Sequence, residues 1–169
     1  ILNWGMVMLW LFMQLSKEKQ NNFNLQNNNM NNQIHPCLWF DGNAKEAAEF
    51  YCSVFPNSKI IVDTAMVVNF ELNGKKYMGL NGGPMFKFNE AVSFVVDCET
   101  QEEIDYYWEK LTAGGSESQC GWLKDKFGLS WQIVPTVLGK LMSDPEKAPA
   151  VMQAFMKMKK FDIETLMNA

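Results

Sequence analysis

The sequence contains a single histidine, His35, among 169 residues. Histidine is the side chain best suited to acid-base chemistry near neutral pH, and it is a common metal ligand. Any Ser-His-Asp arrangement would therefore have to use this one residue. The sequence offers few ways to build a histidine-dependent active site.

The chain also lacks an excess of positive charge. Fifteen basic residues stand against nineteen acidic residues, which gives a net charge of −4. Binding to a nucleic-acid backbone requires a basic surface, so we expect no nucleic-acid partner. A composition with 47% hydrophobic and 20% charged residues is typical of one globular domain with a sizeable core.

Paired cysteine motifs are absent as well. The four cysteines, Cys37, Cys52, Cys98 and Cys120, are widely spaced, and none forms a C-x-x-C pair. Each lies within an otherwise apolar strand or helix pattern. We therefore expect buried free thiols and a cytoplasmic protein, rather than disulfides or a zinc site.

No apolar run reaches the ~20 residues that span a bilayer. Residues 1–15 are apolar and uncharged, but no basic residue precedes them and no small-residue cleavage site follows. Residues 21–32 are asparagine-rich and predict a flexible linker. We expect residues 1–33 to be an N-terminal extension to a domain that begins near Met30, with no membrane partner. An exported or membrane-tethered form is the alternative.

A strand followed by a helix occurs twice in the remaining sequence. Residues 34–41 predict a strand that ends at Gly42, and Asn43 is expected to cap the helix that follows. A similar unit returns at residues 92–111. Two such units predict an α+β fold with a pair of curved sheets and a cleft between the halves.

Further elements follow each unit. In the first, Asn73-Gly74 predicts a hairpin between the last two strands. In the second, the apolar run 92–97 predicts a strand buried on both faces, and Thr100 with Glu103 forms a capping-box pattern. The other expected strands are 59–62, 66–72, 76–80, 119–124 and 129–134, and the expected C-terminal helices are 137–142, 145–158 and 163–167.

Three motifs, at residues 38–44, 80–84 and 120–135, resemble the PhnB-like proteins of the vicinal oxygen chelate superfamily. These proteins are often labelled as similar to a 3-demethylubiquinone-9 3-methyltransferase. The resemblance implies paired βαβββ modules at residues 34–86 and 90–135, followed by C-terminal helices at 136–169. No glycine-rich nucleotide motif follows the first strand, so we do not expect methyltransferase activity.

Members of this superfamily often hold a divalent metal that chelates two neighbouring substrate oxygens. Here Gln132 stands where the resemblance places a ligand Glu, and Ala91, which has no donor atom, stands where it places a His. His35 lies near another ligand position but one residue out of phase, which turns a strand side chain to the opposite face. The implied metal site is therefore degenerate, with His35 and Gln132 as candidate ligands.

Three functions remain open. The leading hypothesis is a small-molecule binding protein, and the resemblance implies a homodimer. The alternatives are a metal-dependent glyoxalase-like or resistance-type enzyme acting on vicinal oxygens, and a protein that sequesters a drug. We expect turn or capping roles for Asp41, Asp97 and Asp125. The expected cleft residues are Trp39, Asn81, Cys120, Trp122, Trp131 and Gln132.

The first unit departs from the family between Ile60 and Met66, where the family usually has a longer loop. Two alternatives fit the short segment 61–65: a tight turn at Asp63-Thr64, or one long strand. Either would reshape one wall of the cleft.

Overall fold

The computed structural model describes residues 33–169, and residues 35–169 form one compact unit. The expected extension and asparagine-rich linker fall almost entirely on residues 1–32, which lie outside the described part. Within residues 33–169, no helix has the length and apolar character needed to cross a membrane.

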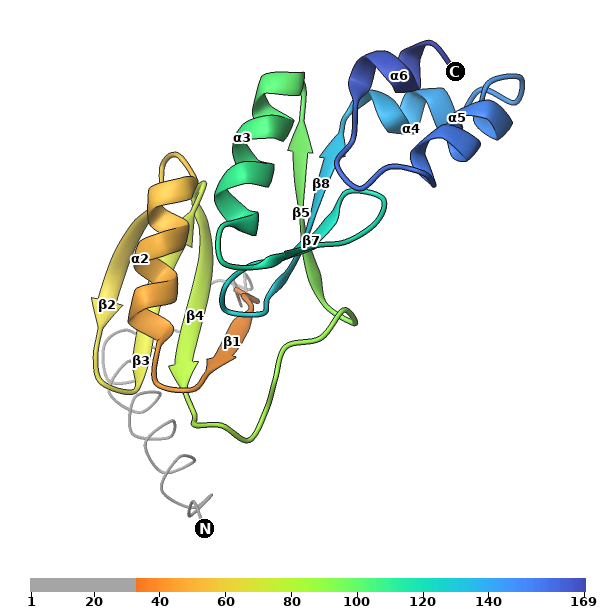
Figure 1. The fold of residues 1–169 in the computed structure, drawn as a ribbon. Helices are drawn as coiled ribbons and strands as arrows, with labels where there is room; N and C mark the ends of the chain where they lie inside the picture. The colour runs from red at the N-terminus through yellow and green to blue at the C-terminus, as the bar shows by residue number, and fades with distance from the viewer. Residues whose placement is uncertain (1–32) are drawn as a thin grey trace, which may run out of the picture. The chain divides into compact units, whose positions relative to one another are not determined.

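The first module is a βαβββ unit (Figure 1). Its sheet has the strand order β1-β4-β3-β2, with β1 parallel to β4 and the other pairs antiparallel. Asn73 and Gly74 both have positive φ and form the predicted hairpin turn between β3 and β4. The elements are β1 (Cys37–Phe40), α2 (Ala44–Val54), β2 (Lys59–Asp63), β3 (Val67–Leu72) and β4 (Lys75–Asn81).

The short segment after β2 forms a tight turn, which decides between the two alternatives. The backbone N–H of Thr64 donates to the carbonyl of Val67, and the N–H of Val67 donates to the Thr64 hydroxyl. Strand β2 also contains a bulge between Ile60 and Val62. The chain therefore reverses direction within a few residues instead of forming one long strand.

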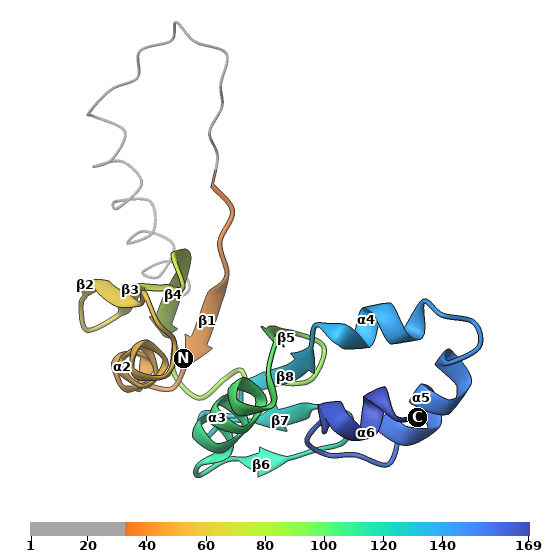
Figure 2. The ribbon, with the colours of Figure 1, turned by 90° about the horizontal axis from the view of Figure 1, so that it is seen from above.

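The second module repeats the first, with strand order β5-β8-β7-β6 (Figure 2). Thr100 and Glu103 form the predicted capping box. Strand β6 was not predicted, because two residues are too few to show an alternating pattern. The elements are β5 (Ser93–Cys98), α3 (Gln101–Thr112), β6 (Ser116–Glu117), β7 (Trp122–Lys124) and β8 (Ser130–Pro135).

Three short helices follow β8: α4 (Val137–Met142), α5 (Ala148–Phe155) and α6 (Ile163–Met167) (Figure 1). The predicted bounds of α4 and α6 are confirmed, whereas α5 is shorter than expected. The segment before α6 is held to the turn before β7, where the N–H of Gly121 donates to the Lys159 carbonyl at 2.7 Å. Phe161 from the same segment packs against Gly121 and is 2% exposed.

In the described part of the chain, each sheet is covered by helix on one face only. Helix α2 packs on β3 and β4, and α3 packs on β7 and β8, with alternate strand residues forming the core between them. Val95 of β5 faces the other side and is 54% exposed. The prediction that β5 is buried on both faces was therefore wrong. Its apolar run has one uncovered face because no second layer among residues 33–169 covers the open side of the sheet.

A buried carboxylate joins the two modules. Asp125, in the β7–β8 turn, is 3% exposed and accepts from the Tyr51 hydroxyl of α2 and the Trp131 indole N–H, each at 2.8 Å. It also accepts from the backbone N–H groups of Phe127 and Leu129. Burial raises the pKa of Asp125, while these four donors act in the opposite direction. The turn role expected for Asp125 thus extends to a tertiary contact between modules.

Candidate functional site

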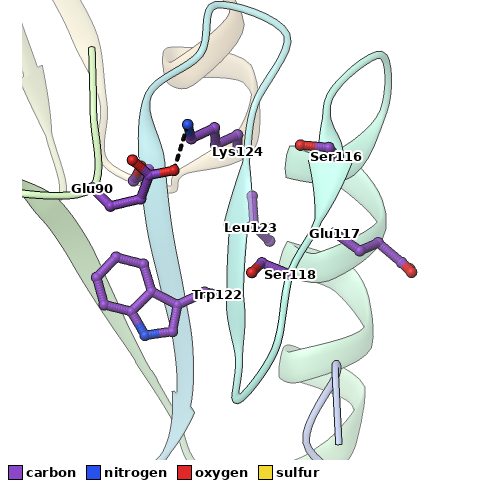
Figure 3. Close-up of a pocket in the computed structure, with 8 residues that line it drawn as sticks. Glu90, Ser116, Glu117, Ser118, Trp122, Leu123 and Lys124 are labelled. Carbon is purple, nitrogen blue, oxygen red and sulfur yellow. Dashed lines mark ion pairs between the residues drawn. The ribbon is translucent and has the colours of Figure 1, made fainter.

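The open face of the second sheet carries a pocket of about 340 Å³ (Figure 3). Its wall is built by β6, β7 and β8 together with the loop before β5. The lining residues are Glu90, Ser116, Glu117, Ser118, Trp122, Leu123, Lys124 and Ser130.

Strand register explains why several of these side chains share one face. Lys124 of β7 lies directly opposite Ser116 of β6 and Ser130 of β8, and side chains of paired residues project from the same side of a sheet. Trp122 is two residues from Lys124 along β7 and so projects from that side as well. The hairpin thereby places an ammonium group, hydroxyls and an indole around one hollow.

Ser130 is the unusual member of the pocket. The residue is 0% exposed, and its Oγ has no hydrogen-bond partner within the described part of the chain. A buried hydroxyl without a partner costs free energy, on the order of 1–3 kcal/mol, so native proteins seldom retain one without a reason. The pocket wall thus holds an unused hydrogen-bonding group just beneath its surface, which a ligand reaches when the covering side chains move.

The charges at the pocket are compensated. The Lys124 ammonium lies 2.6 Å from a Glu90 carboxylate oxygen, and this hydrogen bond lowers the pKa of Glu90 (Figure 3). Glu117 turns toward α3, where it accepts from the Trp108 indole at 3.0 Å and lies 3.3 Å from Lys159. Each carboxylate at the rim therefore has its own cation.

Two of the six expected cleft residues lie on this open face. Trp122 lines the pocket directly. Gln132 of β8 lies opposite Trp122, and its Nε2 donates to the Ser93 hydroxyl at 2.9 Å. This amide therefore already holds a partner on β5.

The other four lie elsewhere. Trp39 is in the first sheet, where its indole N–H donates to Gly83 and its ring contacts Phe86 edge-on. The Cys120 thiol is 3.7 Å from the Phe155 carbonyl, and Trp131 is buried in the core at 3% exposure. The structure does not bring these residues together with Trp122 in one pocket.

Asn81 caps helix α2 from outside that helix. Its Oδ1 accepts from the Ala44 N–H at 2.9 Å, and its Nδ2 donates to the Ala65 carbonyl at 2.9 Å. The predicted capping by the Asn43 side chain was wrong, because that side chain makes no capping hydrogen bond. Asn81 at the end of β4 already occupies the helix terminus, a contact between residues 37 positions apart that local sequence does not reveal.

The candidate metal ligands do not form a cluster. His35 is exposed and precedes β1, and Ala91 lies in the turn before β5. Among residues 33–169, no group of three or more His, Cys, Asp or Glu side chains is placed to hold a metal ion. The donors found within these residues do not fit a divalent-metal centre, since such ions need several carboxylate, imidazole or thiolate donors.

Sequence reasoning did not identify Glu90, Ser116, Ser118, Lys124 or Ser130. The one available signal was the alternation within the 122–132 hairpin, which places Trp122, Lys124, Ser130 and Gln132 on one face. Serine and lysine on a strand are ordinary surface residues, so that signal indicates a polar face and does not indicate a pocket.

Comparison with known proteins agrees with this architecture. The 3-demethylubiquinone-9 3-methyltransferase family profile matches residues 32–134. The PhnB protein from Bacillus cereus is 33% identical, with a TM-score of 0.58, over 62% of this chain and 100% of that one. No curated protein matches the chain.

Two more distant structures share the fold. Protein PA1353 from Pseudomonas aeruginosa is 19% identical with a TM-score of 0.53, over 62% of this chain and 97% of that one. The fosfomycin resistance protein FosX from Listeria monocytogenes, whose structure was determined with Mn(II) and sulfate ion, is 16% identical with a TM-score of 0.52. The match covers 68% of this chain and 98% of that one. At these identities the likeness shows the fold alone.

Proposed function

The chain belongs to the 3-demethylubiquinone-9 3-methyltransferase family, the PhnB-like branch of the vicinal oxygen chelate superfamily, and on this premise we propose that it binds a small molecule in the pocket on its second sheet. The family description names a methyl transfer, but we do not assign that activity here. Strand β1 passes into α2 through Asp41, Gly42 and Asn43 alone, which leaves no glycine-rich loop for a nucleotide-like methyl donor.

The observation that carries the proposal is the partnerless Ser130 hydroxyl in the wall of the pocket. A volume of about 340 Å³ lies within the range of small-molecule sites, roughly 300–1,000 Å³. Such sites combine an aromatic or apolar surface with a few polar groups that orient the ligand. Trp122 supplies the surface, and Ser130 with Lys124 supplies the polar groups.

We further propose that the protein is a cytoplasmic homodimer whose second copy lies over the open sheet faces and encloses the pocket. Val95 of β5 is 54% exposed and Val62 of β2 is 41% exposed, each on the side of its sheet away from the covering helix. Pairing of modules across chains, as the superfamily resemblance implies, would bury both. The four cysteines are free thiols, which a reducing compartment preserves. The expectation that they are buried was wrong for Cys37, which is exposed, and only Cys98 is fully buried. Light scattering of the wild-type protein tests the dimer, and a monomer would contradict it.

The metal-dependent enzyme remains the alternative, with His35 and Gln132 as ligands that a second chain would have to supplement. It makes a separate prediction for the metal-stripped protein. A metal bound only to the folded state, at a hundredfold excess over its dissociation constant, adds about 2.7 kcal/mol of stability. We expect no rise in melting temperature with Mn²⁺, Zn²⁺, Ni²⁺ or Fe²⁺. A rise that His35→Ala abolishes would favour the metal-dependent enzyme. A protein that only sequesters a drug should bind it equally well without metal and with His35→Ala.

The proposed pocket can be tested through the indole N–H of Trp122. The chain has six tryptophans, so a ¹⁵N spectrum contains few indole signals, and Trp122→Phe identifies the one that matters. We expect at least one of four chemically distinct probes (benzoate, phenethylamine, phenol and D-glucose) to shift the Trp122 signal saturably. The shift should arise because the ring forms the pocket surface.

The Trp39 indole is the internal control, because it belongs to the first sheet and donates to the Gly83 carbonyl, outside the pocket lining. A saturable shift at Trp122 without one at Trp39 supports the proposal. Equal shifts at both positions would indicate a general perturbation and contradict it, as would the absence of any shift with all four probes.

A further inference from the structure

The pocket on the second sheet has unused hydrogen-bonding groups but no unused charge. Within the described residues, the side-chain hydroxyls of Ser116, Ser118 and Ser130 and the indole N–H of Trp122 have no protein partner. Lys124 and Glu90, by contrast, are paired with each other at 2.6 Å. The wall can therefore offer new hydrogen bonds without breaking one inside the protein.

This charge balance disfavours an ionic ligand. An anion would have to compete with Glu90 for Lys124, and a cation would have to compete with Lys124 for Glu90. Glu117, the other charged residue at the wall, is directed toward Trp108 and Lys159. The chain also contains no arginine, the side chain whose planar fork best binds carboxylates and phosphates.

The partnerless groups suit a ligand that both donates and accepts hydrogen bonds. A serine hydroxyl can do either, whereas the indole N–H only donates. The Trp122 ring stacks on no other aromatic ring within the described residues, and it borders the hollow beside Lys124 and Glu90 (Figure 3). A saturated ring with C–H groups on one face and hydroxyls around its edge matches both the apolar ring surface and the hydroxyls around it.

We propose that the ligand is a neutral polyhydroxylated ring of the monosaccharide class, stacked on Trp122 and hydrogen-bonded to Ser130. This inference rests on the proposed function, because it names the ligand class of the same pocket. Once the side chains that cover it move aside, Ser130 Oγ gains the partner that it lacks in the free protein, and the Lys124–Glu90 pair supplies further donors and acceptors at the rim.

Three sugars of one shape but different charge test the inference: D-glucose, D-glucosamine and D-glucuronate, titrated at mildly acidic pH while the Trp122 indole signal is followed. We expect glucose to bind with a dissociation constant on the order of 1 mM, as suits a ligand of this size. The cationic and anionic sugars should bind at least about threefold more weakly, because each must compete with an existing ion pair.

Two matched variants separate binding from folding. Ser130→Ala removes a buried hydroxyl that has no partner, so its melting temperature should not fall, while glucose affinity should drop about fivefold. Ser118→Ala removes an exposed hydroxyl of the same pocket and should change affinity less. A Ser130→Ala variant that melts lower and binds glucose as well as wild type would overturn the inference. It would show that the hydroxyl is hydrogen-bonded to a structural water and not to the ligand.

The non-sugar probes distinguish a wrong ligand class from a wrong pocket. If benzoate, phenethylamine or phenol shifts Trp122 and no sugar does, the pocket is real but the ligand class is wrong. If a charged sugar binds more tightly than glucose, the Lys124–Glu90 pair does not select against ionic ligands and the neutral ligand class is wrong. If no probe of either set shifts Trp122, the proposed function itself fails.

Discussion

Replacing Asp125 with alanine is expected to destabilise the protein by about 3–5 kcal/mol. The change leaves the Tyr51 hydroxyl and the Trp131 indole N–H buried without an acceptor, and it removes the acceptor of two backbone N–H groups in the turn. Because Tyr51 belongs to the first module and Trp131 to the second, the loss also weakens the contact between modules. The free energy of unfolding in urea measures the effect.

Two further variants show how much of this loss is specific. Tyr51→Phe removes one of the four donors and leaves the others in place, so a smaller loss of about 1–2 kcal/mol is expected. Asp41→Ala alters an exposed aspartate in the turn after β1 and should change stability by less than about 0.5 kcal/mol. Equal losses for Asp125→Ala and Asp41→Ala would contradict the role assigned to the buried carboxylate.

The second large effect is expected for Gly121→Ala. This substitution should lower the free energy of unfolding by about 3 kcal/mol or more and weaken the packing of residues 136–169. A Cβ at this position would lie 2.4 Å from the Phe161 ring and 2.7 Å from the Ile133 carbonyl oxygen. The backbone also has φ +80°, which L side chains adopt only with strain. Strain and clash act together, because the C-terminal segment is held to this turn.

Gly128→Ala is the matched control. Gly128 has φ +84°, but a Cβ there would meet nothing within 4 Å, so only backbone strain of about 1 kcal/mol is expected. The difference between the two variants therefore measures the packing of Phe161 on the turn. Hydrogen exchange should show faster amide exchange at Val151 and Leu166 in Gly121→Ala alone. Equal destabilisation by both substitutions would show that the close approach of Phe161 contributes nothing.

Local patterns correctly identified the features whose interacting residues are only a few positions apart in the chain. The Asn73-Gly74 turn depends on two residues with positive φ, and the Thr100–Glu103 capping box closes within one helical turn. The repeat of strand and helix was also visible, because each helix keeps a regular apolar face. Local sequence therefore predicted the paired modules.

The errors arose where a distant residue replaced a local one. Asn43 has the residue type and position of a helix cap, yet Asn81 from β4 accepts the Ala44 N–H instead. Likewise, an apolar run alone cannot tell whether β5 is covered on one face or two, since coverage depends on other layers. Val95 shows the result, because no other segment of residues 33–169 covers its side of the strand.

The sequence by itself determined the apolar faces of the helices, the two βαβββ modules and the family, because these depend on apolar periodicity and on motifs that are contiguous in the chain. Only the tertiary structure decided the candidate site. The pocket exists because strand register sets Ser116, Lys124 and Ser130 side by side, and because the loop before β5 brings Glu90 to Lys124. The tertiary structure also decides which hydroxyl is buried without a partner and which charges are paired, because both depend on residues that are distant in the sequence and neighbours in the fold.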